Sequence, residues 1–157
     1  MRLVVALACY LAASPAIANA QSALDVSGRW SVDGPPESKD FKSPAMGTDI
    51  TIEHAGGKIT VEYSMNRKRT WTLDGVEYKT LVRVADAGSY TEIGRAHIAK
   101  DRIVLVSGRD RGGRVNREER TLYRKGDKLI VEGTAWLDNK VINTSTLSYR
   151  RSTPVTK

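Results

Sequence analysis

The tripeptide Gly28-Arg29-Trp30 opens the part of the chain that decides the fold. It follows an apolar leader and precedes short stretches rich in Val, Ile, Thr, Tyr and Trp, each bounded by a compact turn signal. Such stretches favour β-strands, because branched and aromatic side chains pack well on a pleated surface. We therefore expect an all-β protein in which Trp30, on the first strand, plugs one end of a small barrel.

Turn signals recur at nearly even intervals after this first strand. Each signal is a short segment that contains Gly, Asp or Asn. The signals are marked by Gly56, Asp74, Ala87, Lys100, Gly112, Gly126 and Asn139. Even spacing with such corners is typical of consecutive β-hairpins, because tight hairpin turns need positive φ. The widest interval, between Gly56 and Asp74, contains Met65-Asn66-Arg67, which we interpret as a further turn.

Alternation of apolar and polar residues supports the strands between these turns. Ile50 and Ile52 face away from Thr51, for example, and a period of two indicates a strand with one wet face. Ile103-Val104-Leu105-Val106 is apolar at every position, so we expect a stretch that is covered on both faces.

A long run of antiparallel strands twists and leaves open edges unless the sheet closes on itself. We therefore predict a single up-and-down antiparallel β-barrel of about 8–10 strands. A two-sheet sandwich is the alternative, which the even hairpin spacing disfavours.

Residues 1–20 have the features of a secretory signal peptide. Arg2 precedes an apolar run, Leu3 to Ala13, that is too short to span a bilayer, and Ala18-Asn19-Ala20 matches the small-residue cleavage pattern. A lipoprotein signal at Cys9 is the alternative, which the short apolar segment before it disfavours.

Cleavage would leave residues 21–157 as one barrel domain without a transmembrane segment, and we expect it to be periplasmic or secreted. Cys9 is the only cysteine and leaves with the leader, so packing alone must hold the domain together. The formal net charge of +7 suits loose attraction to anionic surfaces, although ordinary solubility is the explanation we prefer.

Gly28-Arg29-Trp30 at the head of a meander resembles the first strand of the calycins, which include lipocalins and fatty-acid-binding proteins. Lipocalins carry a basic residue on the last strand that packs over this tryptophan as a cation–π lid. The resemblance gives that role to Arg150, with Arg151 as the alternative, after Leu147-Ser148-Tyr149. It therefore implies a lipocalin-like barrel plugged by Gly28, Trp30 and Arg150.

The chain also resembles a family of exported bacterial β-barrel domains of unknown function. The resemblance is carried by the opening Gly-x-Trp and by Trp71 before Leu73-Asp74-Gly75-Val76-Glu77-Tyr78. It implies a lipocalin-like domain over the whole mature chain.

No pattern of catalytic or metal-binding residues stands out. His54 and His97 lie on different expected strands, and Glu53 points away from His54. The glycine pairs do not precede helices, so nothing in the sequence cradles a phosphate. We expect no catalytic residue, no metal and no cofactor, we do not expect an enzyme, and we expect no binding of nucleic acid.

The first candidate site is a set of aromatic residues spread over the strands. Its members are Tyr63, Trp71, Tyr78, Tyr90 and Trp136, with Tyr149 on the last strand. If several point inward, they line a cavity with polar tips, as in a binding barrel; if they do not, they form the core. On this basis our first hypothesis is a monomeric exported protein that binds a small apolar or amphiphilic ligand.

The second candidate site is a hairpin rich in guanidinium groups. Arg109, Arg111, Arg114 and Arg117 surround the turn at Gly112-Gly113. Such groups bind carboxylates and phosphates, so the alternative hypothesis is a protein that docks an anionic envelope component here and uses the barrel only as scaffold. The competing explanation is a solvated loop, partly neutralised by Glu118 and Glu119.

Overall fold

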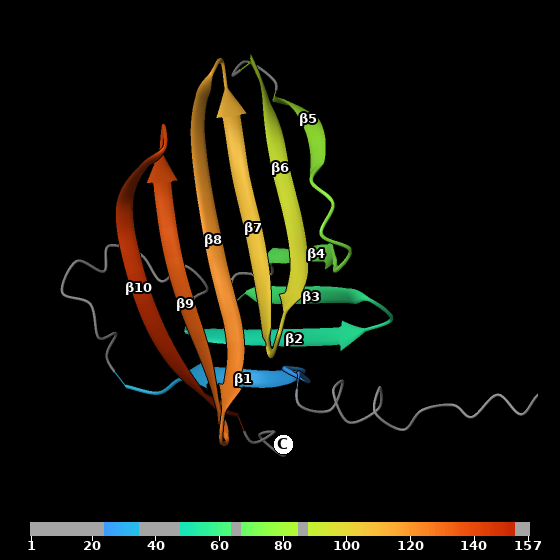
Figure 1. Cartoon of the computed structure of the whole chain (residues 1–157), viewed down its shortest axis with the longest axis vertical. Helices are drawn as coiled ribbons and strands as arrows, with labels where there is room; N and C mark the ends of the chain where they lie inside the picture. Colours follow the sequence, from blue (N-terminus) through green and yellow to red (C-terminus); the bar gives the residue numbers. More distant parts are fainter. Residues whose placement is uncertain (1–23, 35–47, 64–66, 85–87, 153–157) are drawn as a thin grey trace, which may run out of the picture.

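The computed structural model describes residues 24–34, 48–63, 67–84 and 88–152, which form ten β-strands in one antiparallel sheet (Figure 1). The strands are β1 (Gly28–Val32), β2 (Asp49–Ala55), β3 (Lys58–Tyr63), β4 (Arg67–Thr72), β5 (Tyr78–Val84), β6 (Gly88–Ala99), β7 (Arg102–Arg111), β8 (Arg114–Lys125), β9 (Lys128–Leu137) and β10 (Lys140–Arg151).

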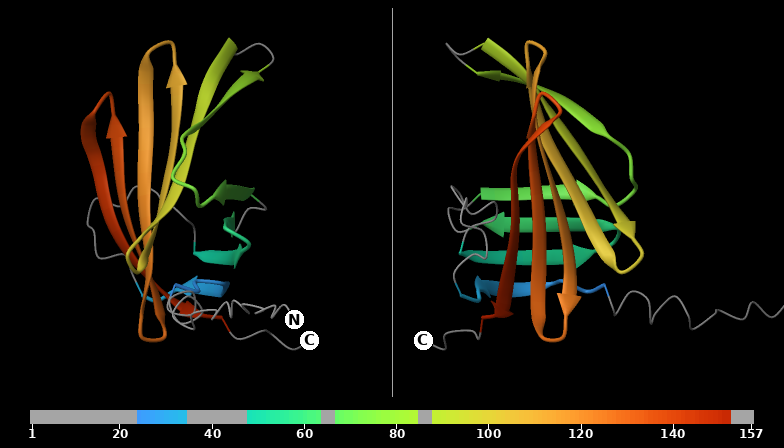
Figure 2. Two further views of the ribbon diagram at one scale, coloured as in Figure 1. Left: turned by 45° about the vertical axis from the view of Figure 1, so that its right-hand side comes forward. Right: turned by 60° about the vertical axis from the view of Figure 1, so that its left-hand side comes forward.

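The sheet curls because its first and last strands pair. The order of the ten strands across the sheet is β4-β3-β2-β1-β10-β9-β8-β7-β6-β5. In the pair of β1 with β10, Trp30 lies opposite Arg151. Figures 1 and 2 show the short strands β1–β4 crossing the lower halves of the long strands β6–β10. The predicted single up-and-down barrel is confirmed, and it is open along one line, the seam between the free edges of β4 and β5.

Left-handed backbone occurs at the predicted corners. The φ angle is 58° at Gly56, 80° at Gly88, 59° at Lys100, 62° at Gly112, 65° at Gly126 and 65° at Asn139. The turn predicted at Met65-Asn66-Arg67 includes residues 64–66, which lie outside the described residues. The strands on either side of it, β3 and β4, do pair, so the wide interval holds two strands.

Asp74-Gly75 was predicted to be another hairpin turn, and this is wrong because β4 and β5 do not pair. The Gly75 amide donates instead to the carbonyl of Ala96 on β6, at 2.8 Å. The Asp74 carboxylate accepts hydrogen bonds from the Val76 amide, at 2.9 Å, and from the Tyr78 hydroxyl. The hydrogen bond from Gly75 binds the connection to β6, and β5 then pairs with β6 rather than with β4, which leaves the seam.

Trp30 is completely buried at the base of the barrel, and its Nε1 donates to the carbonyl of Val26 at 3.0 Å. Gly28 has φ +138°, and a Cβ there would lie 3.5 Å from Trp30 Nε1 and 3.7 Å from Arg151 Cζ. Glycine therefore suits this position for two reasons: it adopts the positive φ without strain, and it lets the side chains of Trp30 and Arg151 approach the backbone closely. The stacked cation is Arg151, at 5.3 Å from the Trp30 ring centroid.

Arg150, our first candidate for the lid, has a different partner. Side chains alternate across a strand, so Arg150 faces away from Trp30. Its Nε contacts the Asp33 carboxylate at 2.7 Å, and Lys128 contacts the other oxygen at 2.6 Å. The role expected of Arg150 therefore passes to Arg151.

The core lies where β1–β4 cross the long strands. It is formed by Val26, Trp30, Ile50, Ile52, Ile59, Val61, Trp71, Ala96, Ile103, Leu105, Leu122, Leu129, Val131, Leu147 and Tyr149. Val104 and Val106 are also buried, although they face the outer side of β7. The expectation that Ile103-Val104-Leu105-Val106 is covered on both faces is thus confirmed.

The expected signal peptide and most of the proline-rich connection, residues 35–47, lie outside the described residues. Within the described residues no helix is long and apolar enough to cross a membrane.

Candidate functional site

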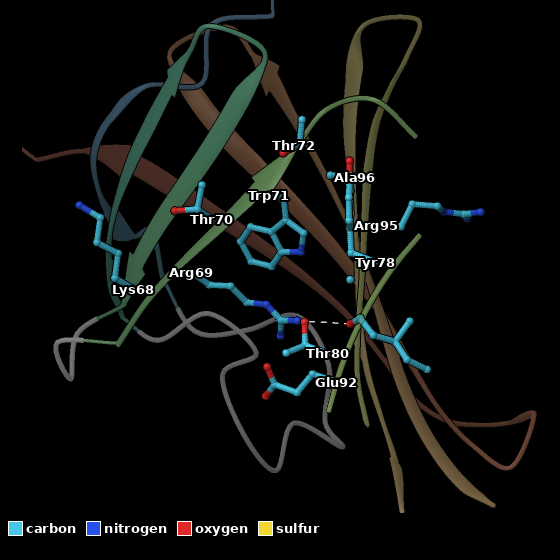
Figure 3. Close-up of a pocket in the computed structure, with 12 residues that line it drawn as sticks. Lys68, Arg69, Thr70, Trp71, Thr72, Tyr78, Thr80, Glu92, Arg95 and Ala96 are labelled. Atoms are coloured by element: carbon cyan, nitrogen blue, oxygen red, sulfur yellow. Dashed lines mark hydrogen bonds between the residues drawn. The ribbon is translucent and has the colours of Figure 1, made fainter. Parts of the chain in front are cut away.

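A pocket of about 370 Å³ lies in the seam, between the free edge of β4 and the inner faces of β5 and β6 (Figure 3). Its walls contain two of the predicted aromatic residues and several charged ones. The lining residues are Lys68, Arg69, Thr70, Trp71, Thr72, Tyr78, Thr80, Glu92, Ile93, Gly94, Arg95 and Ala96. Binding pockets for small molecules typically measure about 300–1,000 Å³, so this one suits a small ligand.

Trp71 forms the apolar wall of the seam pocket. It lies on the inner face of β4, is 5% exposed, and donates from Nε1 to the carbonyl of Val106 at 3.3 Å. The guanidinium of Arg69, two residues earlier on the same face, lies 5.1 Å from its ring centroid. The hydrogen bond to Val106 and the contact with Arg69 therefore hold the ring in position at the wall of the pocket.

Arg69 bridges the seam. Its Nη2 donates to the carbonyl of Ile93 on β6 at 3.3 Å, the contact drawn as a dashed line in Figure 3. Among the described residues no carboxylate lies within 4.0 Å of Arg69, although the pocket also contains Glu92, which pairs with Arg109. A guanidinium carries five donors, so most of those on Arg69 are available to a ligand.

A second charged group lies deeper, on the inner face of β8. Arg120 has a side chain only 10% exposed and donates to Glu118 from Nη2 at 2.6 Å. Its Nη1 lies 3.5 Å from the Tyr63 hydroxyl, and its buried Nε has no hydrogen-bond partner among the described residues. Burial raises the pKa of Tyr63, and the positive charges of Arg120 and Arg69 oppose this rise. Tyr63 thus lies near two guanidinium groups.

Sequence reasoning missed Arg69 and Arg120. Each lies two residues before an apolar inward residue, Trp71 and Leu122 respectively, so the same alternation that located the core also places these cations inside. A charged residue at an inward position of an otherwise alternating strand was the available signal.

The predicted aromatic residues other than Trp136 lie on the inner side of the sheet, at three places. Trp71 and Tyr78 line the seam pocket, while Tyr63 and the fully buried Tyr149 lie within the barrel. Tyr90 lies on the inner face of β6, under Arg109 at 5.1 Å and Arg111 at 5.8 Å from its ring centroid.

Trp136 does not line the interior. It pairs with Arg117 across β8 and β9, on the face opposite to the core residues Leu129 and Val131. The guanidinium of Arg117 lies 5.9 Å from its ring centroid. The prediction that Trp136 lines a ligand-binding cavity is therefore wrong, because Trp136 lies on the outer surface of the sheet.

The four arginines of the β7–β8 hairpin do not form one surface. Strand alternation puts Arg109, Arg111 and Arg114 on the inner side and Arg117 on the outer side. Carboxylates lie near three of them, with Glu92 at 3.7 Å from Arg109, Asp138 at 3.8 Å from Arg114 and Glu119 at 4.0 Å from Arg117. The β7–β8 hairpin therefore has no continuous basic patch, formed by all four arginines, onto which an anionic partner could dock.

The two histidines lie apart from the seam pocket. Neither His54 nor His97 lines it, and among the described residues neither has a carboxylate within 4.0 Å. A cluster of three or more potential metal ligands is also absent from that part of the chain.

A second hollow, of about 500 Å³, lies against the base of β8–β10 and includes Asp33 and Lys128. The Asp33 carboxylate is already paired with Lys128 and Arg150, so this carboxylate and these two cations satisfy one another. We therefore take the seam pocket as the candidate site.

No protein-family model matches the chain, and no curated protein matches it. The chain is similar to several solved structures, two of which follow. A mutant of the fluorescent protein UnaG aligns over 82% of this chain and 96% of its own, with 18% identity and a TM-score of 0.48. A luciferase domain from the dinoflagellate Lingulodinium polyedrum aligns over 82% of this chain and 42% of its own, with 17% identity and a TM-score of 0.50. At this identity the similarity to the luciferase domain concerns the fold alone.

Proposed function

We propose that the protein is an exported binding protein that holds a small amphiphilic molecule in the seam pocket. The apolar part of the ligand packs on Trp71, and its polar or anionic end accepts hydrogen bonds from Arg69. Export is inferred from the leader, residues 1–20, with its apolar run and its small-residue cleavage pattern.

The observation that carries this proposal is the combination of Trp71 and Arg69 in one pocket. A nearly buried indole supplies apolar contact area, while a guanidinium without a carboxylate within 4.0 Å, among the described residues, supplies unused donors. Arg120, whose charge is balanced by Glu118 at 2.6 Å, and Tyr63 lie on the inner side as well and add polar groups there. The guanidinium of Arg69, which has no such carboxylate among the described residues, thus favours a ligand with an anionic group over a purely apolar one.

Titration with 1-anilinonaphthalene-8-sulfonate, an anionic amphiphile whose fluorescence rises in apolar surroundings, tests the proposal. Gly94→Leu fills the pocket, because a Cβ at Gly94 already lies 3.7 Å from Arg69 Nη2 and 4.0 Å from Trp71. We expect this variant to abolish the fluorescence rise and Arg69→Met to weaken probe binding about tenfold, as for the loss of a charge-assisted hydrogen bond. The matched control is Arg83→Met, which removes an exposed arginine of β5 outside the pocket.

Circular dichroism shows whether each variant is folded. Equal probe binding by wild type, Gly94→Leu and Arg69→Met would exclude the seam pocket as the site. Native mass spectrometry of protein purified from its own periplasm then identifies the natural ligand as added mass.

A further inference from the structure

The β9–β10 hairpin tip exposes two adjacent aliphatic residues. Val141 and Ile142 are each 58% exposed, and one residue, Lys140, separates them from the turn at Asp138 and Asn139. The pairing with β9 shifts between Val141 and Asn143, so Ile142 is the extra residue of a β-bulge. Single exposed apolar residues are ordinary in soluble proteins, whereas here two large aliphatic side chains are exposed next to each other at one hairpin tip.

Trp136 extends this surface onto the outer face of the sheet. It lies directly opposite Val141 across β9 and β10, and it is only partly buried. Tryptophan is enriched where apolar and aqueous phases meet, because its ring is apolar and its indole N–H is polar. We call Val141, Ile142 and Trp136 the apolar tip.

Three cations border the apolar tip. Arg114, on the inner side of the sheet, reaches Asp138 in the hairpin turn at 3.8 Å, whereas Arg117, on the outer side, lies beside Trp136 and 4.0 Å from Glu119. Their side chains are 70% and 43% exposed. Lys140, which precedes Val141, is exposed and has no carboxylate within 4.0 Å among the described residues. Such long, exposed ion pairs are weak and are easily exchanged for other anions.

We propose that the apolar tip docks the protein onto an anionic lipid surface. Val141 and Ile142 enter the headgroup region, Trp136 lies at its boundary, and the cations that border the tip contact lipid phosphates. The tip lies at the end of the sheet away from β1, so docking leaves the plugged base of the barrel facing water (Figure 1).

The small size of the apolar tip favours a lipid over a protein partner. A stable protein interface buries about 800 Å² on each side, which is more than three side chains provide. The strength of membrane binding, by contrast, scales with the apolar area inserted and with the attraction of cations to anionic lipids, so a few side chains of each kind contribute to it. This inference is independent of any ligand in the seam pocket.

Co-sedimentation with lipid vesicles tests the proposal. The wild-type protein is mixed with vesicles of phosphatidylcholine alone or of phosphatidylcholine with phosphatidylglycerol. We expect sedimentation with the anionic vesicles only, decreasing as salt is raised, and a blue shift of tryptophan fluorescence that Trp136→Phe removes. The double variant Val141→Asp and Ile142→Asp should bind at least about tenfold more weakly, because two apolar contacts become two charges that the headgroups repel.

Matched controls separate the tip from general effects of charge and exposure. Val76→Asp and Leu81→Asp replace aliphatic residues that are 52% and 59% exposed outside the tip, and they should bind as the wild type does. Arg114→Ser with Lys140→Ser should weaken binding, whereas Lys58→Ser with Lys125→Ser should weaken it less, because Lys58 and Lys125 do not border the tip.

Three outcomes would overturn the proposal. They are no binding of the wild type to anionic vesicles, unchanged binding by the double aspartate variant, and equal loss of binding in the controls. Self-association that the double aspartate variant abolishes, measured by light scattering without lipid, would instead assign the tip to contact with a second copy of the chain. Circular dichroism of every variant shows whether a loss of binding reflects unfolding.

Discussion

Arg151 on the last strand covers Trp30 on the first. Its Cζ lies 5.3 Å from the centroid of the indole ring, and its Nη2 donates to the carbonyl of Ser27 at 3.1 Å. One side chain therefore ties the end of the described chain to its beginning, over a completely buried aromatic ring of the core.

Shortening either side chain of this contact should destabilise the barrel, and the loss should be larger for the buried Trp30 than for the exposed Arg151. We expect Trp30→Ala to lower the free energy of unfolding by about 3–5 kcal/mol, because it empties a completely buried site. Arg151→Met should lower it by about 0.5–1 kcal/mol, the value of an exposed cation–π contact. Denaturant titration measures both. In NMR spectra Arg151→Met should shift the Trp30 indole N–H resonance, whereas Arg150→Met should leave it unchanged.

The pair formed by Arg120 and Glu118 should be strongly coupled. Glu118→Gln leaves an arginine side chain that is only 10% exposed without its carboxylate, and we expect a loss of about 1–3 kcal/mol in the free energy of unfolding. Adding Arg120→Met to this variant removes the uncompensated charge. The double variant should therefore be less destabilised than the sum of the single variants by about 1 kcal/mol or more. Additive losses in denaturant titrations would show that the two side chains do not interact.

Gly108 on β7 should not tolerate a side chain. A Cβ at this position would lie 2.9 Å from the backbone oxygen of Asn116, which cannot move without shifting β8. We expect Gly108→Ala to cost about 1–3 kcal/mol of stability. Gly94→Ala is the control, because its Cβ would meet its nearest neighbour at an ordinary 3.7 Å, and its stability should stay within about 1 kcal/mol of wild type. Thermal unfolding followed by circular dichroism measures both variants.

Asp33 should make the protein sensitive to acid. The hydrogen bond from Lys128, followed by that from Arg150, lowers the pKa of Asp33 below its ordinary value of 3.8. The unfolded chain therefore takes up a proton at higher pH than the folded chain. The stabilisation is complete above about pH 3.8 and is lost as the pH falls through the lower folded value.

Two measurements check this pH dependence. The difference in unfolding free energy between wild type and Asp33→Asn should be constant above pH 3.8 and should shrink below it. In a carboxyl NMR titration Lys128→Met should move the pKa of Asp33 back toward its ordinary value. An Asp33 titration that is identical with and without Lys128 would contradict this assignment.

Local chemistry made the strands and hairpins predictable. The φ values at Gly112 and Asn139, for example, are those that the turn residues require. The seam was not predictable in this way, because Asp74-Gly75 has the same local chemistry as the true hairpin turns. Only the hydrogen bond from Gly75 to Ala96, a contact between distant residues, distinguishes it. Which side of the barrel opens therefore depends on long-range contacts that turn residues do not reveal.

The candidate site was predictable in part for a similar reason. Aromatic residues attracted attention by type, and Trp71 and Tyr78 do line the pocket. Trp136 lies outside because the register of the strand decides on which face a side chain lies, and the residue type alone does not reveal this. Arg69 and Arg120 are inside for the same reason, although charged residues are ordinarily assigned to the surface.

The pairing of β1 with β10 separates the ends of the chain from the edges of the sheet. The termini of the barrel lie side by side within the hydrogen-bonded ladder, where the Ser152 amide donates to the Arg29 carbonyl at 2.9 Å. The sheet edges, by contrast, lie in mid-chain at the Asp74-Gly75 connection. A circular permutant that joins β10 to β1 by a short linker and begins at β5 would run from β5 to β4 in the order in which the strands lie across the sheet. Its chain would then pass from one free edge to the other, and every connection in it would join neighbouring strands.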